Sequence, residues 1–285
     1  MPSLAVALLN GLTWGLAVAL IALGLNLIFG LLEVVNMSHG ALYMLGAVAT
    51  AVLVGATGSF LLALVVAPLA VGALGVATER LVLRPVEDDL STSLIATFGL
   101  MLVFEHAALV WFGPGTRAVP APIDVTVAIG GVSYSGYRLL VALASLGLVG
   151  LLHLFLRSTR HGLWMRGVRQ DRETAAAMGV PTSRVYMFTF GLGAGLAALA
   201  GVLLVPIVSA NHLMGLDVLA VAFIVVIVGG LGSMRGVLVA SLVYALVENL
   251  ATVAVPPVEA RVLTLVAMIA FVLVRPEGLF GEVTT

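Results

Sequence analysis

The sequence predicts an all-α polytopic membrane protein with eight to nine transmembrane helices. Of its 285 residues, 61% are hydrophobic and only 9% are charged, and the mean hydropathy is +1.20. Soluble domains carry about a quarter charged residues, so this composition excludes a soluble globular chain. The apolar residues are gathered in runs of about 20, which is the length of a membrane-spanning helix.

Nine apolar segments follow one another, separated by turn residues or polar residues. They cover residues 4–32, 41–54, 60–78, 92–112, 139–156, 186–206, 218–228, 237–255 and 262–274. The seventh is short, so the count depends on whether the run that ends at Gly230 crosses the membrane completely. The first is expected to be a retained span, because Met1-Pro2-Ser3 lacks basic residues and the run is too long for a signal peptide.

Two polar interruptions, one in each half of the chain, are expected at membrane depth. They are residues 33–40 (E-V-V-N-M-S-H-G) and 229–236 (G-G-L-G-S-M-R-G). Broken segments in corresponding halves point to the central site of a transporter, because non-helical backbone survives there only where protein or water covers it. The alternative is a pair of plain interfacial turns, with His39 as a hydrogen-bonded structural histidine.

Three ionisable residues, Glu105, His106 and Glu248, lie inside apolar runs. A charge at bilayer depth costs at least about 2.5 kcal/mol, so such side chains face a bundle interior or a cavity. Glu105 is close to Gly113 and is expected at the outer interface. The candidates for the translocation pathway or gate are Asn26, Asn36, Ser38, His39, Gly229, Gly230, Ser233 and Glu248.

Residues 113–138 form the longest connection in the first half of the chain. Gly113-Pro114-Gly115 ends the preceding helix, and residues alternate around Gly130-Gly131. This pattern predicts a small β-hairpin outside the membrane.

Capping and helix-breaking residues mark other helix ends. Pro85 is expected to end any helix in the connection 79–89. Asp89 or Ser91 can then cap the next span. Similarly, Thr182 or Ser183 can cap the span that starts near Tyr186.

The most polar stretch is residues 157–185, which carries six of the chain's 13 arginines. By the positive-inside rule this segment is cytoplasmic. Alternation from there places residues 113–138 outside the cell and the C-terminus inside. The same alternation would place the N-terminus outside, but the break at 33–40 carries no arginine, so that end stays open.

Within this stretch, Asp171 is expected to cap a short helix that starts at Arg172 and ends at Gly179 and Pro181. Arginines lie on one side of this helix. The residues on another side are Ala175, Ala176 and Met178. Such small residues would fit closely into a cleft of a partner, which makes this helix a docking element. The alternative is an ordinary loop that only fixes the topology.

Four motifs resemble, in order along the chain, those of branched-chain amino-acid permeases of the LivH type, which are subunits of ABC importers. Residues 36–47 are similar to N-F-A-H-G-x-F-Y-M-L-G-A in that family. Residues 173–179 (E-T-A-A-A-M-G) resemble the coupling loop E-A-A-x-x-x-G, and the preceding arginine-rich residues resemble its LivH-type version. Residues 229–236 resemble the turn G-G-L-G-S-x-x-G, and residues 275–281 match R-P-x-G-L-F-G.

The departures from the family pattern are few. Thr174 replaces the first alanine of the coupling motif, and Ser38 replaces a small alanine. Glu105-His106 stands where the family often carries a neutral amide pair, which leaves the substrate open.

The resemblance implies a single transmembrane permease domain, residues 1–285, in the bacterial cytoplasmic (inner) membrane, with a cytoplasmic C-terminus. It implies a second homologous permease subunit, two cytoplasmic ABC ATPases and an extracytoplasmic substrate-binding protein. The coupling residues would be Arg166, Arg169, Asp171, Arg172, Glu173, Ala175, Ala176 and Gly179. The chain would pass branched-chain amino acids, and the partner ATPases would use the ATP and Mg²⁺.

No cofactor is expected on this chain. It contains no lysine and therefore no P-loop, it contains no cysteine, and neither a metal cluster nor a catalytic constellation can be assembled. An enzyme is therefore the least favoured interpretation. The net charge of −1 gives no basic field for nucleic acid.

Two other transport functions stay open. The first is the same machinery with urea or short amides as substrate. The second is an ion-coupled secondary transporter that works alone through Glu105, His106 or Glu248.

Overall fold

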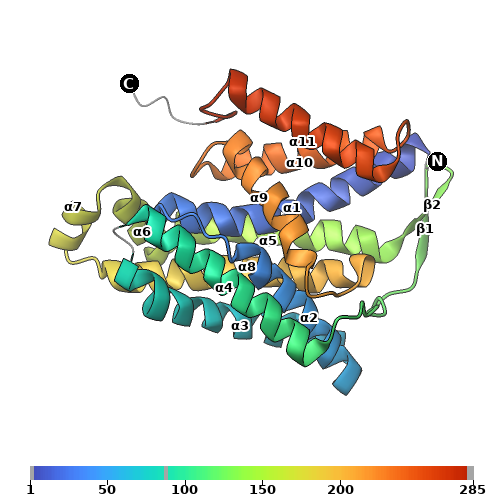
Figure 1. Ribbon diagram of the computed structural model, residues 1–285. Helices are drawn as coiled ribbons and strands as arrows, with labels where there is room; N and C mark the ends of the chain where they lie inside the picture. Colours follow the sequence, from blue (N-terminus) through green and yellow to red (C-terminus); the bar gives the residue numbers. More distant parts are fainter. Residues whose placement is uncertain (1–2, 87–88, 281–285) are drawn as a thin grey trace.

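The computed structural model describes residues 3–86 and 89–280. Met1-Pro2, part of the 79–89 connection, and Gly281 at the end of the C-terminal motif lie outside this range. Within it, eight helices are long and apolar enough to cross a membrane: α1 (Leu4–Leu32), α2 (His39–Thr57), α3 (Phe60–Thr78, extended to Val86), α4 (Leu90–Phe112), α5 (Gly136–Ser158), α8 (Thr182–Val208), α10 (Met234–Ala251) and α11 (Pro257–Val274) (Figure 1). A shorter apolar helix, α9 (Met214–Gly229), has 16 residues. The predicted fold class is confirmed.

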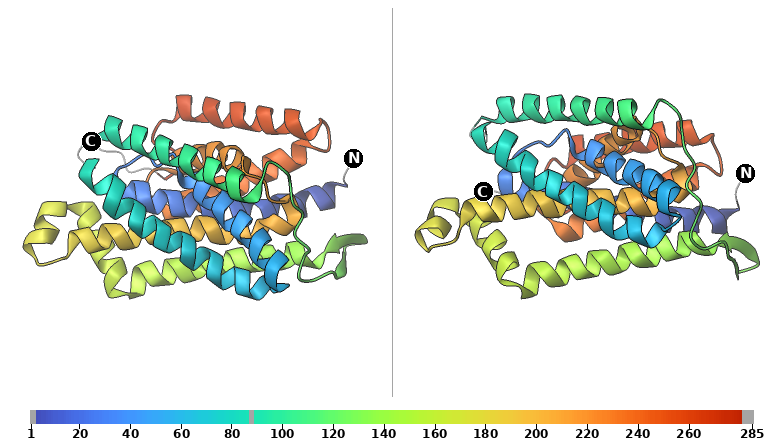
Figure 2. Two further views of the ribbon diagram at one scale, coloured as in Figure 1. Left: turned by 60° about the horizontal axis from the view of Figure 1, so that its bottom comes forward. Right: turned by 90° about the horizontal axis from the view of Figure 1, so that it is seen from below.

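The helix bundle has two opposite ends, and each end carries small additional elements. One end carries the start of α1 and a two-stranded antiparallel sheet, β1 (Thr126–Ile129) and β2 (Val132–Ser135). The other carries α6 (Arg160–Gln170), α7 (Arg172–Ala177) and the C-terminal segment (Figure 2). We call these the hairpin end and the Arg-rich end. In the hairpin, Ile129 pairs with Val132 across Gly130 and Gly131, which both have positive φ, as the alternation predicted.

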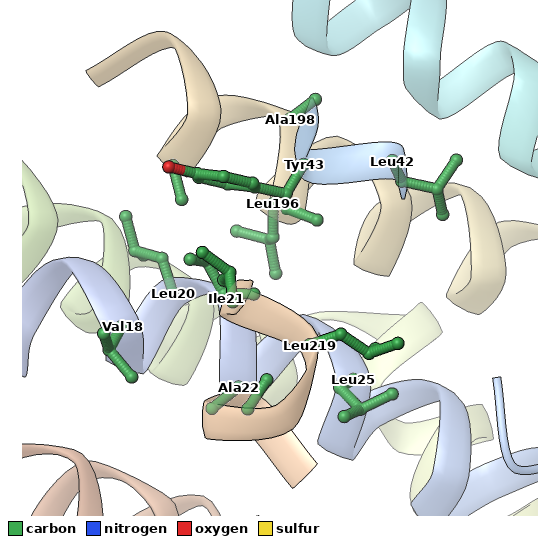
Figure 3. Close-up of a cluster of buried hydrophobic side chains, with 14 of the residues drawn as sticks. Val18, Leu20, Ile21, Ala22, Leu25, Leu42, Tyr43, Leu196, Ala198 and Leu219 are labelled. Carbon is green, nitrogen blue, oxygen red and sulfur yellow. The ribbon is translucent and has the colours of Figure 1, made fainter. Parts of the chain in front are cut away.

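At the centre lie two antiparallel helices, α1 and α8 (Figure 1). Gly24 and Gly193 bring their backbones together: a Cβ on either would lie 2.6–2.7 Å from the other's carbonyl oxygen. Lipid gives helices no hydrophobic reason to associate, so such close approach supplies the van der Waals contact that holds them. Figure 3 shows the core beside this pair, where Tyr43 of α2 and Leu219 of α9 meet α1 and α8.

The two halves of the chain contain the same arrangement of helices, running in opposite directions. The helix α1 ends at Glu33 (φ 57°) and α8 ends at Ser209 (φ 62°); these are the only non-glycine residues with positive φ in the described range. After each end, an asparagine side chain accepts the backbone N–H two residues later: Asn36 from Ser38 (3.1 Å) and Asn211 from Leu213 (3.0 Å). The next residue then starts α2 or α9. This relates α1–α4 to α8–α11 as an inverted repeat.

The repeat corrects one correspondence expected from the sequence. The predicted breaks 33–40 and 229–236 are non-helical only over residues 33–38 and 230–233, because His39 starts α2, Gly229 ends α9 and Met234 starts α10. However, the counterpart of 33–38 in the second half is 209–213, which the sequence indicated only as a short loop. The segment 230–233 is a separate turn between α9 and α10.

The helix end at Pro85 was predicted wrongly. Helical backbone continues from α3 through a π-helix, Glu79–Leu83, and a 3-10 turn, Arg84–Val86. The Arg84 N–H donates to the Glu79 carbonyl in the wide π turn, and the two side chains form a 3.2 Å ion pair. Pro85 comes after Arg84, the donor of this last hydrogen bond, so the missing N–H of proline does not disrupt the π turn.

The predicted helix caps were right in one place and wrong in another. Asp89 caps α4 by accepting the Ser91 N–H at 3.0 Å. Neither Thr182 nor Ser183 caps α8, which starts after Pro181 without a side-chain cap. Because proline fixes a φ compatible with a helix start, the turn forms without one.

Candidate coupling surface and translocation path

The short helix α7 is capped as predicted. The Asp171 carboxylate accepts the Thr174 N–H at 3.0 Å and also the Thr174 hydroxyl. At the other end, Gly179 has φ 84°, and the N–H groups of Gly179 and Val180 donate to Ala176 and Ala175. Both ends of this six-residue turn are therefore closed by local hydrogen bonds, which gives it a defined shape outside the helix bundle.

The exposed residues of α7 and its C-cap include Glu173, Ala176 and Met178. Met178 is 81% exposed. The Arg172 guanidinium lies 5.0 Å from the centre of the Tyr186 ring, which holds it against α8. Of the small residues expected to dock, Ala175 is buried, so it anchors the turn and leaves Ala176 for contact with a partner.

The neighbouring helix α6 was not predicted. Its apolar face is only Met165 and Val168, which pack in one cluster with Leu31 of α1 and Ala175 of α7. The arginine-rich composition hides this amphipathic spacing, which is the signal that could have revealed the helix. In α6, the Arg166 guanidinium donates to the Leu156 carbonyl at the end of α5.

A chain of hydrogen bonds joins α6 to the middle of the bundle. The Arg169 guanidinium donates to the Gly232 carbonyl at 2.8 Å, and the Gly232 N–H donates to the Asn26 side chain at 2.7 Å. One glycine of the 230–233 turn therefore connects the Arg-rich end with α1. The sequence indicated the segments that contain Arg169, Gly232 and Asn26, but it did not predict that these residues are in contact.

The same turn is braced by the C-terminal motif. The N–H groups of Leu279 and Phe280 donate to the carbonyls of Val228 and Gly229, at 2.7 and 3.3 Å. Gly278 (φ 73°) makes this possible, because a Cβ there would meet the backbone of α9. Further along, Gly230 (φ 97°) ends α9, Gly236 packs on Gly229, and the Ser233 hydroxyl caps α10 at 3.1 Å. Two motifs about 40 residues apart in the sequence thus form one unit.

The first break, 33–38, is held in place by side-chain hydrogen bonds. The Asn36 side chain accepts the Ser38 N–H and also its hydroxyl, the latter at 2.6 Å. Thr97 of α4 joins it by accepting the Met37 N–H and donating to the Val35 carbonyl, at 3.2 and 3.1 Å. Thr97 carried no signal in the sequence, because one threonine in an apolar run is common.

His39 lies at the start of α2, fully buried against α1. Its Nε2 is 2.9 Å from the Ile21 carbonyl. Its Nδ1 has no hydrogen-bond partner among the described residues. The contact with Ile21 agrees with the alternative that His39 is a hydrogen-bonded structural histidine. A role of His39 in the translocation pathway stays a prediction.

Glu105, which was expected at the outer interface, and Glu248 each have a buried carboxylate oxygen. Glu105 is 5% exposed, and its Oε1 has no partner in the part of the chain that the structure describes, whereas the adjacent His106 is exposed and contacts the Leu102 carbonyl. Glu248 of α10 lines a cavity close to the hairpin end. The polar residues around it, Tyr244 and Arg261, were not singled out from the sequence.

We expect α7 to be sensitive to acid. Hydrogen bonds from the Thr174 hydroxyl and N–H lower the pKa of Asp171 below its ordinary value. A lowered pKa means that the cap stabilises α7 at neutral pH and loses this effect as pH falls through the folded-state pKa, below about 4. The Thr174 amide, with its hydrogen exchange corrected for intrinsic rate, should stay protected from pH 8 to 5 and lose this protection only as pH falls below about 4. Asp171→Ala should remove that protection at every pH, whereas Asp89→Ala, which uncaps α4, should not.

A family model described as "Branched-chain amino acid transport system / permease component" matches residues 7–273. The chain belongs to this family. It is therefore a multi-pass membrane permease component, as the motifs predicted. Family membership favours a transport subunit over an enzyme.

Named relatives of this permease align over nearly their whole length. The high-affinity branched-chain amino acid transport system permease protein LivH of Escherichia coli K12 is 28% identical over 289 residues, or 96% of this chain and 94% of the relative. LivH of Salmonella typhimurium is 27% identical with the same coverage. BraD of Pseudomonas aeruginosa is 26% identical over 291 residues, covering 96% and 95%. No solved structure matches the chain.

Proposed function

We propose that this permease is the membrane-spanning subunit of a binding-protein-dependent ABC importer for branched-chain amino acids. Its Arg-rich end would face the cytoplasm, which places the C-terminus there too, and its hairpin end would meet an extracytoplasmic binding protein. A second homologous permease would complete the pathway. Two ATPases would bind ATP and Mg²⁺ and drive import.

The observation that carries this proposal is the position of α7. It projects from the bundle as a closed turn with an exposed face (Figure 1), and α6 beside it contacts the 230–233 turn through Arg169. Movement imposed on α7 would therefore reach the α9–α10 junction and α1 through rigid contacts. ATP-driven closure can move the gate only by favouring one arrangement of these helices.

The test is L-leucine uptake into proteoliposomes that contain the chain, its permease partner and both ATPases. The binding protein is added on the side of the membrane opposite the ATPases. Uptake should require ATP. Uptake of urea instead of leucine would assign the urea or short-amide function. Leucine uptake by this chain alone, driven by an ion gradient without ATP, would overturn the importer proposal in favour of a secondary transporter.

Substitutions in α7 should uncouple this system. Glu173→Ala removes an exposed charge, and Gly179→Val forces a branched residue into left-handed backbone, which costs about 1–2 kcal/mol. Both should lower transport-coupled ATPase activity and uptake several-fold. Arg80→Ala, which removes an exposed charge outside α7 and away from the hairpin end, is the matched control. Unchanged uptake in both α7 variants would sink the coupling assignment.

A further inference from the structure

A cavity of about 180 Å³ lies among α1, α2, the end of α8, α9, α10 and α11, close to the hairpin end. Its polar side carries Tyr244 and Glu248 from α10 and Arg261 from α11. The apolar residues around it are Trp14, Tyr43, Val208, Met214, Val218 and Val221. A water molecule needs about 10–15 Å³ of such space, so the cavity is large enough for a small organic molecule.

Two buried polar atoms in this cavity have incomplete hydrogen bonding. Glu248 Oε2 and Tyr244 OH make no hydrogen bond of full geometry with any of the described residues, although the two side chains interact with each other and with Arg261. Tyr244 is itself fully buried, and it precedes Glu248 by one helical turn, so both side chains project from the same face. An unsatisfied buried polar group costs about 1–3 kcal/mol. Such a pair therefore indicates a ligand that supplies the missing hydrogen bonds.

The mouth of the cavity is charged. Asp217 at the start of α9 and Arg261 have side chains that are 74% and 35% exposed, 3.8 Å apart. The Arg261 guanidinium also donates to the Asp217 carbonyl at 2.6 Å. Charges on transmembrane helices avoid lipid, so the mouth adjoins water or another protein. The ion pair uses part of the guanidinium and leaves donors for a ligand.

A second cavity of about 210 Å³ shares Trp14 and Glu248 with the first and is also lined by Arg138 and Thr252. The 209–213 break beside the first cavity is held by two backbone hydrogen bonds of 2.9 Å between Arg117 and Ala210. Glu248 therefore lines both cavities.

We infer that the cavity binds a free α-amino acid with an aliphatic side chain. The Glu248 carboxylate accepts hydrogen bonds from the ammonium group, while the Tyr244 hydroxyl and the Arg261 guanidinium donate to the carboxylate. The valines and the rings of Trp14 and Tyr43 surround the side chain. This inference rests on the proposed function and deepens it, because it places recognition of the amino acid in the permease itself and not in the binding protein alone.

The three tryptophans of the chain provide a direct test. Trp111→Phe and Trp164→Phe leave Trp14, in the cavity wall, as the only tryptophan. In the permease complex in nanodiscs, the signal of the same complex with Trp14→Phe is subtracted to remove the tryptophans of the partner subunits, and L-leucine should change the remaining Trp14 fluorescence saturably. 4-Methylpentanoate lacks the ammonium group and 3-methylbutylamine lacks the carboxylate, so both should bind at least about tenfold more weakly, as expected for the loss of a charged hydrogen bond.

Substitutions then assign the contacts. Glu248→Gln should raise the apparent Kd for L-leucine at least about tenfold, and Tyr244→Phe, which removes one oxygen, should raise it several-fold. Glu259→Gln, an exposed glutamate outside the cavity, should leave it unchanged. If Glu248→Gln does not fold, as judged by its thermal transition, the analogues and Tyr244→Phe still decide the matter.

Two outcomes separate this inference from the proposed function. If Trp14 does not respond to L-leucine and Glu248→Gln importers take up leucine with wild-type KM, the cavity site is overturned and the importer stands. If Trp14 responds with the expected selectivity but the wild-type assembly shows no ATP-driven uptake, the importer falls and the binding site remains.

Discussion

Replacing Arg169 by alanine should reduce ATP-driven leucine uptake at least about tenfold while the ATPases continue to hydrolyse ATP. Arg169 is the residue of α6 whose guanidinium reaches the Gly232 carbonyl, at 2.8 Å. The Gly232 N–H in turn donates to the Asn26 side chain, near the C-terminal end of the central helix α1, at 2.7 Å. A hydrogen bond from a charged group contributes about 1.5–3 kcal/mol, which corresponds to roughly tenfold or more in an equilibrium between two bundle arrangements.

The measurement compares uptake with ATP hydrolysis in the same proteoliposomes. Arg160→Ala is the matched control, since Arg160 is exposed on the same helix and its guanidinium lies over the Trp164 ring. Arg169→Lys keeps the charge and one donor, so it should retain part of the uptake. If Arg169→Ala transports like Arg160→Ala, the contact with Gly232 carries no coupling.

Most of the helix boundaries could be predicted, because each span is an apolar run of the length that a bilayer requires. The run 4–32 coincides with α1. The cap at Asp171 and the hairpin at Gly130-Gly131 were predictable for a different reason: their geometry is set by residues next to each other in the chain. Local rules suffice where the structure is local.

Two kinds of feature escaped prediction. The amphipathic helix α6 was missed because few of its residues are buried, namely Gly162, Met165 and Val168, and these do not stand out among the arginines. The contacts of the candidate site were missed because they join residues far apart in the chain. Asn26 was selected as a polar group in an apolar run, but its partner Gly232 follows 206 residues later. Arg261 stands near the start of a span, where an anchoring arginine needs no further explanation.

The inverted repeat shows why the second break was assigned to the wrong residues. Asn36 and Asn211 make equivalent turns, but only the first lies in a motif of the resemblance. The second is surrounded by Ser209, Ala210 and His212, which read as an ordinary loop. The equivalence becomes visible only when Gly40 and Gly215, four residues after each asparagine, are found in contact.

That contact should make Gly40 one of the least replaceable residues. A Cβ on Gly40 would lie 2.8 Å from the Leu219 Cβ, 2.9 Å from the Gly215 carbonyl carbon and closer still to its oxygen. A Cβ on Gly215 would lie 2.7 Å from the Gly40 carbonyl carbon. Neither neighbour can yield, because both are backbone. We expect Gly40→Ala and Gly215→Ala each to destabilise the chain by about 3 kcal/mol, the upper range for overpacking a core.

Gly147→Ala is the matched control, because Gly147 lies within α5 and a Cβ there meets nothing within 4 Å. Alanine favours a helix over glycine by about 0.5–1 kcal/mol, so this variant should be as stable as the wild type or more so. Thermal unfolding of the three variants in nanodiscs measures the difference. Equal transition temperatures for Gly40→Ala and Gly147→Ala would show that α2 and α9 separate at no cost. A lower temperature for both variants of the Gly40–Gly215 pair, with Gly147→Ala unaffected, would show that the two halves are held together where their breaks meet.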